Sequence, residues 1–216
     1  MGDPKNYKEI LERDDKDAWI IATNNELKSM IVNEVWDIVD RPTVDKEGKQ
    51  IKVIDSKWVF KVKTNSEGEK QEKARLVIRG FKDNNEYGLQ ETYAPVSRQP
   101  VVRAFLNETL EQEIYMEIPD GLGYDQETKK NKVCKIKKAL YGLKVSPKRW
   151  NKKLTKEAKT LGLQNDSNEP CIFTWHKNGK FVILIVYVDD MYLTGNDPER
   201  IQEIKIIFTK YLELKI

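Results

Sequence analysis

The order of apolar and polar residues along this chain predicts three helices. The first covers residues 16–33, and its expected buried side chains are Trp19, Ala22, Leu27, Met30 and Ile31. The second begins at Ser146, which is expected to cap it, and ends at Gly162. Its expected buried stripe consists of Trp150, Leu154, Ala158 and Leu161. Asp197 is expected to cap the third. The expected buried side of this helix contains Ile201, Ile204, Phe208 and either Tyr211 or Leu212.

Other segments have the pattern of strands. Residues 35–39 are expected to form a short strand, closed by Arg41 and Pro42. Residues 56–63 and 73–79 are expected to form two strands, joined by a turn at 65–68. In the first of this pair apolar and basic side chains alternate, so one face is expected to be buried.

A third group of strands surrounds two carboxylates. Residues 181–188 are continuously apolar, which is typical of a strand buried on both faces. The run stops at Asp189 and Asp190, and a second apolar segment ends at Gly195. We therefore expect a hairpin with both aspartates at its tip. Helices combined with antiparallel hairpins predict an α+β fold.

Composition restricts the class of protein. The chain has 216 residues, 39% of them hydrophobic and 34% charged, and no apolar run reaches the ~20 residues of a membrane helix. No membrane partner is therefore expected. Two cysteines, Cys134 and Cys171, favour a reducing, intracellular compartment, cytoplasmic or nuclear. Since His176 is the single histidine, any catalysis should depend on carboxylates, lysines and metal.

Basic residues are concentrated in one block. Residues 129–159 contain 13 Lys or Arg and one acidic residue, Glu157, whereas the remainder of the chain has a net charge of −9. A basic block in an otherwise acidic protein indicates a polyanionic partner, most often nucleic acid. A lysine-rich helix face exposed to water would give the same composition, so both interpretations stay open.

The aspartate pair is the strongest candidate for chemistry. An ionised carboxylate is costly to bury unless it is paired or bound to metal. A bare Asp-Asp pair at a hairpin tip can also be an ordinary turn. The apolar strands on both sides of Asp189 and Asp190 favour the functional interpretation.

Six motifs, in order along the chain, carry a family resemblance. Tyr187-Val188-Asp189-Asp190 resembles the Y-x-D-D signature of reverse transcriptases. The other five resemble the copia-type retrotransposon reverse transcriptase: SKWVFK at 56–61, KARLVIRGF at 73–81, ETYAPV at 91–96, EIYMEIPDG at 113–121, and LYGLK with Ser146-Pro147 and Trp150 at 140–150. The resemblance extends from about Lys8 to the last residue.

The resemblance implies a fold and a division of the chain. It implies the fingers and part of the palm of a right-hand polymerase, an antiparallel sheet with packed helices, and no thumb. Residues 1–103 would form the fingers-like part and the start of the palm. Residues 104–216 would form a partial palm with a returning fingers segment, all within one reverse transcriptase domain.

The resemblance also implies a reaction. Reverse transcriptases extend a primer on an RNA or DNA template with deoxynucleoside triphosphates, and two magnesium ions stabilise the attacking and leaving oxygens. Successive strand residues point to opposite faces, so Asp189 and Asp190 are not expected to be equivalent metal ligands. By position, the resemblance implies that Asp189 is the firm ligand and Asp190 the subsidiary one.

Further roles follow from the same resemblance. Lys73 and Arg75 would face the incoming triphosphate, although charge at an exposed strand edge is an alternative reason for them. Phe105 resembles the aromatic residue that excludes a ribose 2′-hydroxyl, and Tyr141 with Gly142 resembles the segment beneath the nucleotide. The expected nucleic-acid contacts are Lys144, Lys148, Arg149, Lys152 and Lys153. Trp150 is expected to be a core residue rather than a platform for stacked bases.

The sequence departs from the family at one place. The family has an aspartate five residues before the residue equivalent to Phe105, and Pro100 stands there in this chain. A helix and most of a strand are missing near Arg103 and Ala104. Without the aspartate that bridges both metals, we expect the chain as written to be inactive. We also expect an unpaired strand edge or an exposed apolar face in the palm. A non-catalytic nucleic-acid-binding remnant is the alternative.

Overall fold

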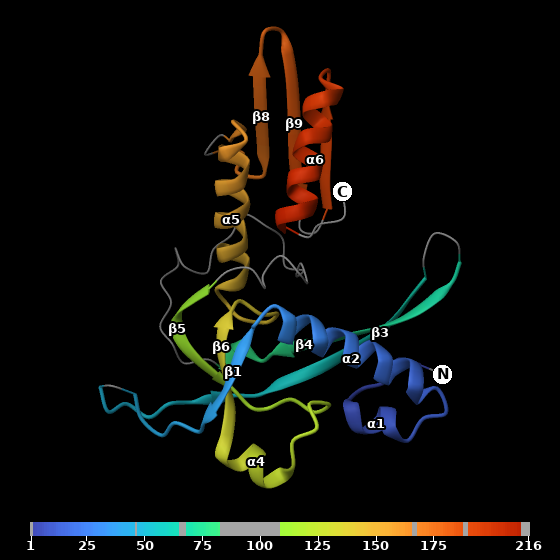
Figure 1. Ribbon diagram of the computed structural model, residues 1–216, viewed down its shortest axis with the longest axis vertical. Coiled ribbons are helices and arrows are strands. Elements are labelled where there is room, and N and C mark those ends of the chain that lie inside the picture. The colour runs from blue at the N-terminus through green and yellow to red at the C-terminus, as the bar shows by residue number, and fades with distance from the viewer. Residues whose placement is uncertain are drawn as a thin grey trace. The chain divides into compact units, whose positions relative to one another are not determined.

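The computed structural model describes residues 2–45, 47–64, 68–82, 109–165, 168–187 and 190–212. Within these residues the chain forms two compact units, the first made of residues 2–82 and 109–143 and the second of residues 144–212 (Figure 1). The division expected at residues 103 and 104 lies outside the described residues. Both units combine helices with antiparallel strands, in agreement with the predicted α+β class.

A four-stranded sheet forms part of the first unit. Its order is β1 (Trp36–Asp40), β6 (Lys132–Lys138), β5 (Thr109–Met116) and β2 (Val53–Ile54). β6 is antiparallel to both β1 and β5, whereas the two-residue β2 is parallel to β5. The expected strand at residues 35–39 is thus confirmed as β1. It pairs with β6, the last strand of the unit, so segments from the beginning and the end of the unit are neighbours in one sheet.

A long hairpin completes the strands of this unit. β3 (Ser56–Thr64) pairs with β4 (Lys70–Ile78) in antiparallel register from Ser56 opposite Ile78 to Thr64 opposite Lys70. The predicted hairpin is confirmed, and its strands are longer than expected. Alternate residues of β4 are buried, namely Ala74, Leu76 and Ile78, because one face of the hairpin packs against α2 (Lys16–Val32).

Helix α2 buries a narrower stripe than the sequence predicted. Trp19, Leu27 and Met30 are buried as expected, and Trp19 meets Phe60 edge to face at 5.6 Å between ring centroids. Ile31, however, is 59% exposed, so its predicted burial is wrong. Thr23 lies on the stripe instead, and its hydroxyl donates to the Trp19 carbonyl at 2.8 Å, which satisfies the buried polar group.

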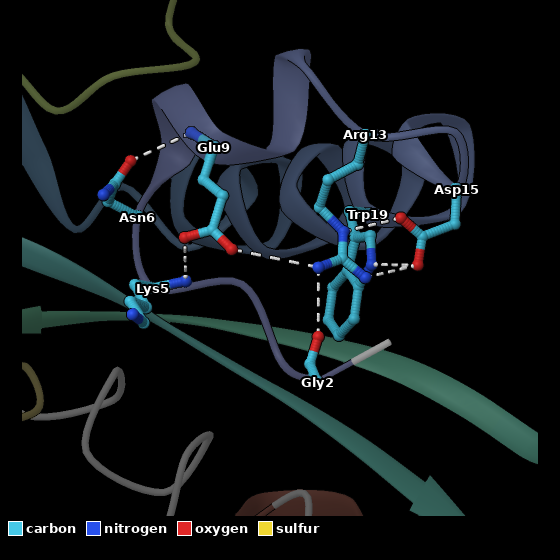
Figure 2. Close-up of polar contacts among 7 residues, drawn as sticks. All are labelled: Gly2, Lys5, Asn6, Glu9, Arg13, Asp15 and Trp19. Carbon is cyan, nitrogen blue, oxygen red and sulfur yellow. Dashed lines mark hydrogen bonds and ion pairs between the residues drawn. The ribbon is translucent and has the colours of Figure 1, made fainter.

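Hydrogen bonds hold the N-terminal segment and α1 (Tyr7–Leu11) to the start of α2 (Figure 2). The Arg13 guanidinium donates to both oxygens of Asp15, at 2.6 and 2.7 Å, and to the Gly2 carbonyl at 3.0 Å. The Trp19 indole donates to the same carboxylate at 3.2 Å. The hydrogen bond from Arg13 lowers the pKa of Asp15 to about 2, so this carboxylate is ionised at neutral pH.

The second unit contains an antiparallel sheet in the order β10 (Asp190–Gly195), β9 (Lys180–Tyr187), β8 (Ile172–Lys177) and β7 (Gln164–Asn165). The predicted hairpin around the aspartates is confirmed in β9 and β10, whose register places Asp190 opposite Tyr187. Among the described residues, β10 is an edge strand with β9 as its one neighbour.

The prediction that this apolar run is buried on both faces is wrong. Val182, Leu184 and Val186 of β9 are buried, but Ile185 is 39% exposed. Its cross-strand partner Tyr192 is 61% exposed. Successive residues of a strand point to opposite faces, and within the described residues one face of the sheet is covered.

Two helices of the described residues belong to this unit. α6 (Pro198–Leu212) packs against β10 and is capped as predicted, because the Asp197 carboxylate accepts from the Arg200 amide at 3.3 Å. α5 (Ser146–Thr160) buries the predicted stripe, and Gly162 follows it with φ of +71°. Trp150 is 1% exposed, which confirms its place in the core.

One detail of α5 differs from the prediction. Ser146 is the first residue inside the helix, and Val145 occupies the N-cap position without a side-chain hydrogen bond. Pro147 in the first turn fits the helix because its missing amide hydrogen has no partner there in any case. Among the helices of the described residues, α5 and α6 included, there is none with the length and apolar character needed to span a membrane.

Candidate functional site

Residues expected to contact the nucleotide meet at the end of β4 in the first unit. The Arg75 guanidinium carbon lies 5.7 Å from the centroid of the Tyr141 ring, a cation–π contact. The Ile78 amide donates to the Tyr141 carbonyl at 2.8 Å. Lys73 lies two residues before Arg75 on the same face of β4 and is exposed. The structure therefore brings Lys73, Arg75 and Tyr141 to one side of the hairpin.

Gly142 has a packing role in this arrangement. Its φ is +89°, and an added Cβ would lie 1.9 Å from the Ile78 carbonyl oxygen. Gly80 faces the same turn, where an added Cβ would lie 2.2 Å from the Gly142 carbonyl oxygen. The resemblance implies that Gly142 lies in the segment beneath the nucleotide. In the structure this glycine allows close approach of two protein backbones.

Sequence reasoning assigned no role to Gly80. The one available signal was the presence of a glycine in each of two motifs, KARLVIRGF and LYGLK. Periodicity cannot reveal that these two glycines meet, because they are far apart in the sequence. Together they fix the position of Tyr141 relative to β4, and thereby the contact between Tyr141 and Arg75.

The candidate catalytic residues are described only in part. The backbone of Asp190 begins β10 opposite Tyr187, so Val188 and Asp189 are the two residues between the paired strand ends. Asp189 and Phe105 lie outside the described residues. The first unit holds Lys73, Arg75, Tyr141 and Gly142, and the second holds Asp190 and the basic helix α5.

The basic block of residues 129–159 is divided between the two units. Its first half lies on β6 and on α4 (Gln126–Asn131), where carboxylates from other elements neutralise most lysines. The N–O distances of these ion pairs are 2.8 Å for Lys129–Asp120, 2.9 Å for Lys132–Asp40, 2.6 Å for Lys135–Glu113 and 2.9 Å for Lys137–Asp37. Lys138 donates to the Asn33 carbonyl. The hydrogen bonds with Glu113 and Asp37 raise the pKa of Lys135 and of Lys137.

The second half of the block lies on α5 and the residues before it. It contains Lys144, Lys148, Arg149, Lys152, Lys153, Lys156 and Lys159, with Glu157 as its one acidic residue. Lys144, Arg149 and Lys153 make contacts within the protein. Within the part of the chain that the structure describes, Lys148, Lys152, Lys156 and Lys159 have no carboxylate partner. Both halves are rich in lysine. Most lysines of the first half are paired with carboxylates, whereas four lysines of the second half have no carboxylate partner within the described residues.

Comparison with known families identifies the chain. The model of the family described as reverse transcriptase (RNA-dependent DNA polymerase) matches residues 33–104 and 99–216. The chain belongs to the reverse transcriptase family. The resemblance seen in the six motifs is thereby confirmed.

Relatives of the chain are transposon polyproteins. It is 32% identical over 235 residues to the Retrovirus-related Pol polyprotein from transposon TNT 1-94 of Nicotiana tabacum, covering 99% of this chain and 17% of that protein. It is also 32% identical over 203 residues to the Pol polyprotein from transposon RE1 of Arabidopsis thaliana, covering 84% and 13%. The Ty1-H Gag-Pol polyprotein of Saccharomyces cerevisiae is 27% identical over 223 residues, covering 94% and 12%. The chain thus spans less than a fifth of the length of these relatives. No solved structure matches the chain.

The family match is interrupted where the sequence departs from the family. Its two pieces overlap at residues 99–104, next to the expected junction at Arg103 and Ala104. The alignment with the tobacco protein extends over 235 positions, whereas the chain has 216 residues, so at least 19 positions of that relative have no counterpart here. Both observations agree with the loss of an internal segment.

The described residues contain no cluster of metal-binding side chains. Among the described residues, no group of three or more His, Cys, Asp or Glu side chains is placed to hold a metal ion. Asp189, the expected firm metal ligand, and Pro100, at the position of the family's third carboxylate, lie outside the described residues.

Proposed function

We propose that this chain is the fingers and partial palm of an RNA-directed DNA polymerase from a copia-type retrotransposon, and that it does not polymerise as written. The observation that carries the proposal is the interrupted family match at residues 99–104, with Pro100 in place of the metal-bridging aspartate. In this assignment the β3–β4 hairpin belongs to the fingers and the β9–β10 hairpin to the palm.

The partners of the parent reaction are a template–primer of RNA or DNA and deoxynucleoside triphosphates. Lys73 and Arg75 supply positive charge for a triphosphate, and the contact between Arg75 and Tyr141 supports this role because it orients the guanidinium. Phe105 would exclude a ribose 2′-hydroxyl. Asp189 and Asp190 remain the carboxylates of the parent centre, without the third one that two magnesium ions require.

The test is primer extension on poly(rA)/oligo(dT) with magnesium and with manganese. Three proteins are compared: the chain as written, a version with the corresponding segment of the tobacco relative inserted between Arg103 and Ala104, and that version with Asp189→Ala. We expect extension only from the restored protein with Asp189 intact. Extension by the chain as written that is abolished by Asp189→Ala would overturn the proposal.

The same pair of proteins can be compared by thermal unfolding. The restored segment supplies a strand and a helix to the palm, where Ile185 and Tyr192 are exposed. We therefore expect it to raise the unfolding temperature. An equally high transition for the chain as written would mean that the loss is a tolerated change of architecture, and would favour the second candidate function.

That second candidate is a nucleic-acid-binding module without chemistry. It is supported by the four lysines of α5 that have no carboxylate partner among the described residues. Binding of duplex by the chain as written, with no extension, would support this function.

A further inference from the structure

The outer face of α5 carries a single stripe of positive charge. The stripe contains Lys148, Lys152, Lys156 and Lys159, which are three or four residues apart. At 3.6 residues per turn, their mean direction lies roughly 150° from that of the buried Trp150, Leu154 and Ala158. Lys152, Lys156 and Lys159 are exposed and Lys148 is half-buried. The four lysines therefore line the side of the helix opposite its core contacts.

Folding alone does not favour this stripe. Like charges three or four residues apart on a helix repel one another and destabilise it. The chain has 35 acidic residues that could alternate with these lysines, as acidic residues do opposite the lysines of β6. Within the described structure, none of the four ammonium groups meets a carboxylate. A polyanion outside the chain would relieve this repulsion.

We propose that Lys148, Lys152, Lys156 and Lys159 form a phosphate-binding stripe for a nucleic-acid duplex. The proposal rests on the proposed function in that template–primer supplies the duplex. From Lys148 to Lys159 the helix advances by eleven steps, about 16 Å at ~1.5 Å per residue. A duplex presents one phosphate charge per ~1.7 Å of axis, so its backbone can engage all four lysines at once.

This stripe differs from the nucleic-acid contacts that the sequence suggested. Lys156 and Lys159 are added, because they continue the line of Lys148 and Lys152 along the helix. Lys144, Arg149 and Lys153 already have contacts within the protein and are left out. Phosphate contacts carry no sequence information, so the stripe binds duplexes of any sequence.

The experiment compares two variants of equal net charge. In the α5 variant Lys148, Lys152, Lys156 and Lys159 are each changed to Gln, whose helix propensity is close to that of lysine. In the control, Lys8, Lys16, Lys28 and Lys49 of the first unit, which are exposed, are changed to Gln. Fluorescence anisotropy measures binding of labelled RNA–DNA duplexes of two unrelated sequences, and thermal unfolding shows that each variant is folded.

We expect the α5 variant to bind both duplexes roughly tenfold more weakly, or worse, and the control to bind within about twofold of the parent. Equal weakening by the control, or undiminished binding by the folded α5 variant, would overturn the proposal. So would a folded parent chain that binds no duplex.

Two provisions keep the outcomes separate. If the four-site variant lacks a cooperative unfolding transition, the double variant Lys152→Gln/Lys156→Gln replaces it. With equal contributions from the four lysines, the double variant should show about half the loss in log affinity. Primer extension by the restored protein tests the polymerase assignment independently. Failure of the stripe therefore leaves that assignment intact, and failure of extension leaves the stripe to be judged by binding.

Discussion

The lysines of β6 and the lysines of α5 belong to one basic block in the sequence, yet the structure uses them differently. On β6, Lys132, Lys135 and Lys137 each form an ion pair with a carboxylate of a neighbouring strand. On α5, Lys152 and Lys156 meet no carboxylate within the described residues. A block of charge in a sequence is therefore not by itself a binding surface, because its partners inside the fold decide how much charge is left for a ligand.

The same distinction applies to the motif residues of the first unit. Gly142 stands in a motif that suggests a nucleotide site, and its surroundings show that the fold itself requires glycine there. Arg75 stands against Tyr141, and Gly80 stands against Gly142. In this unit the motif residues that resemble a ligand site are also required for packing. The lysines of the α5 stripe, in contrast, lie on the side of the helix opposite its core contacts.

Among the substitutions that test this comparison, Gly142→Ala is expected to change the free energy of unfolding most. A side chain at this φ costs roughly 1–2 kcal/mol, and forced overlap costs typically ~1–3 kcal/mol more. Since the added Cβ would lie 1.9 Å from the Ile78 oxygen, we expect a loss of roughly 2–5 kcal/mol in the free energy of unfolding, measured by urea denaturation.

Gly123→Ala is the matched control for this prediction. Gly123 has a similar φ of +77°, and an added Cβ there would meet nothing within 4 Å. It should lose only the backbone term, roughly 1–2 kcal/mol. Equal losses at the two positions would show that the close approach of the 140–143 turn to β4 is not a packing constraint.

A smaller effect separates the two groups of lysines by stability. Lys135→Gln removes the ion pair with Glu113 and should lower the free energy of unfolding by roughly 0.2–1 kcal/mol. Lys152→Gln removes repulsion along α5 and should raise that free energy by roughly 0.2–0.5 kcal/mol per relieved pair. The measurement is urea denaturation at low ionic strength. Destabilisation by Lys152→Gln would contradict the distinction between the groups.

Local sequence patterns predicted the elements that depend on their own residues. Alternation in residues 56–63 predicted β3, the stripe of Trp150, Leu154 and Ala158 predicted α5, and Asp197 predicted the start of α6. Such features depend on the spacing of apolar residues and on the capping residue within one segment, so they can be predicted from that segment alone.

Features that depend on distant segments were not predictable in this way. The pairing of Lys132 with Asp40 requires β1 and β6 to be neighbours, although 92 residues separate the two side chains. The exposed Ile185 depends on which face of the sheet the helices cover. The same holds for the contact of Gly80 with Gly142. The family resemblance located the candidate site, and the fold determined which of its residues are committed to packing.

The most direct test of the contrast between β6 and α5 is the salt dependence of duplex binding. If the four lysines of the α5 stripe make the phosphate contacts, the slope of log K against log salt should be near −4 on DNA duplex, at about −0.9 per phosphate. Changing Lys132, Lys135 and Lys137 to Gln should leave this slope unchanged. A parent slope of roughly −9 or steeper, reduced by about 3 in the β6 variant, would show that the whole block binds as one surface and would contradict the distinction between its two halves.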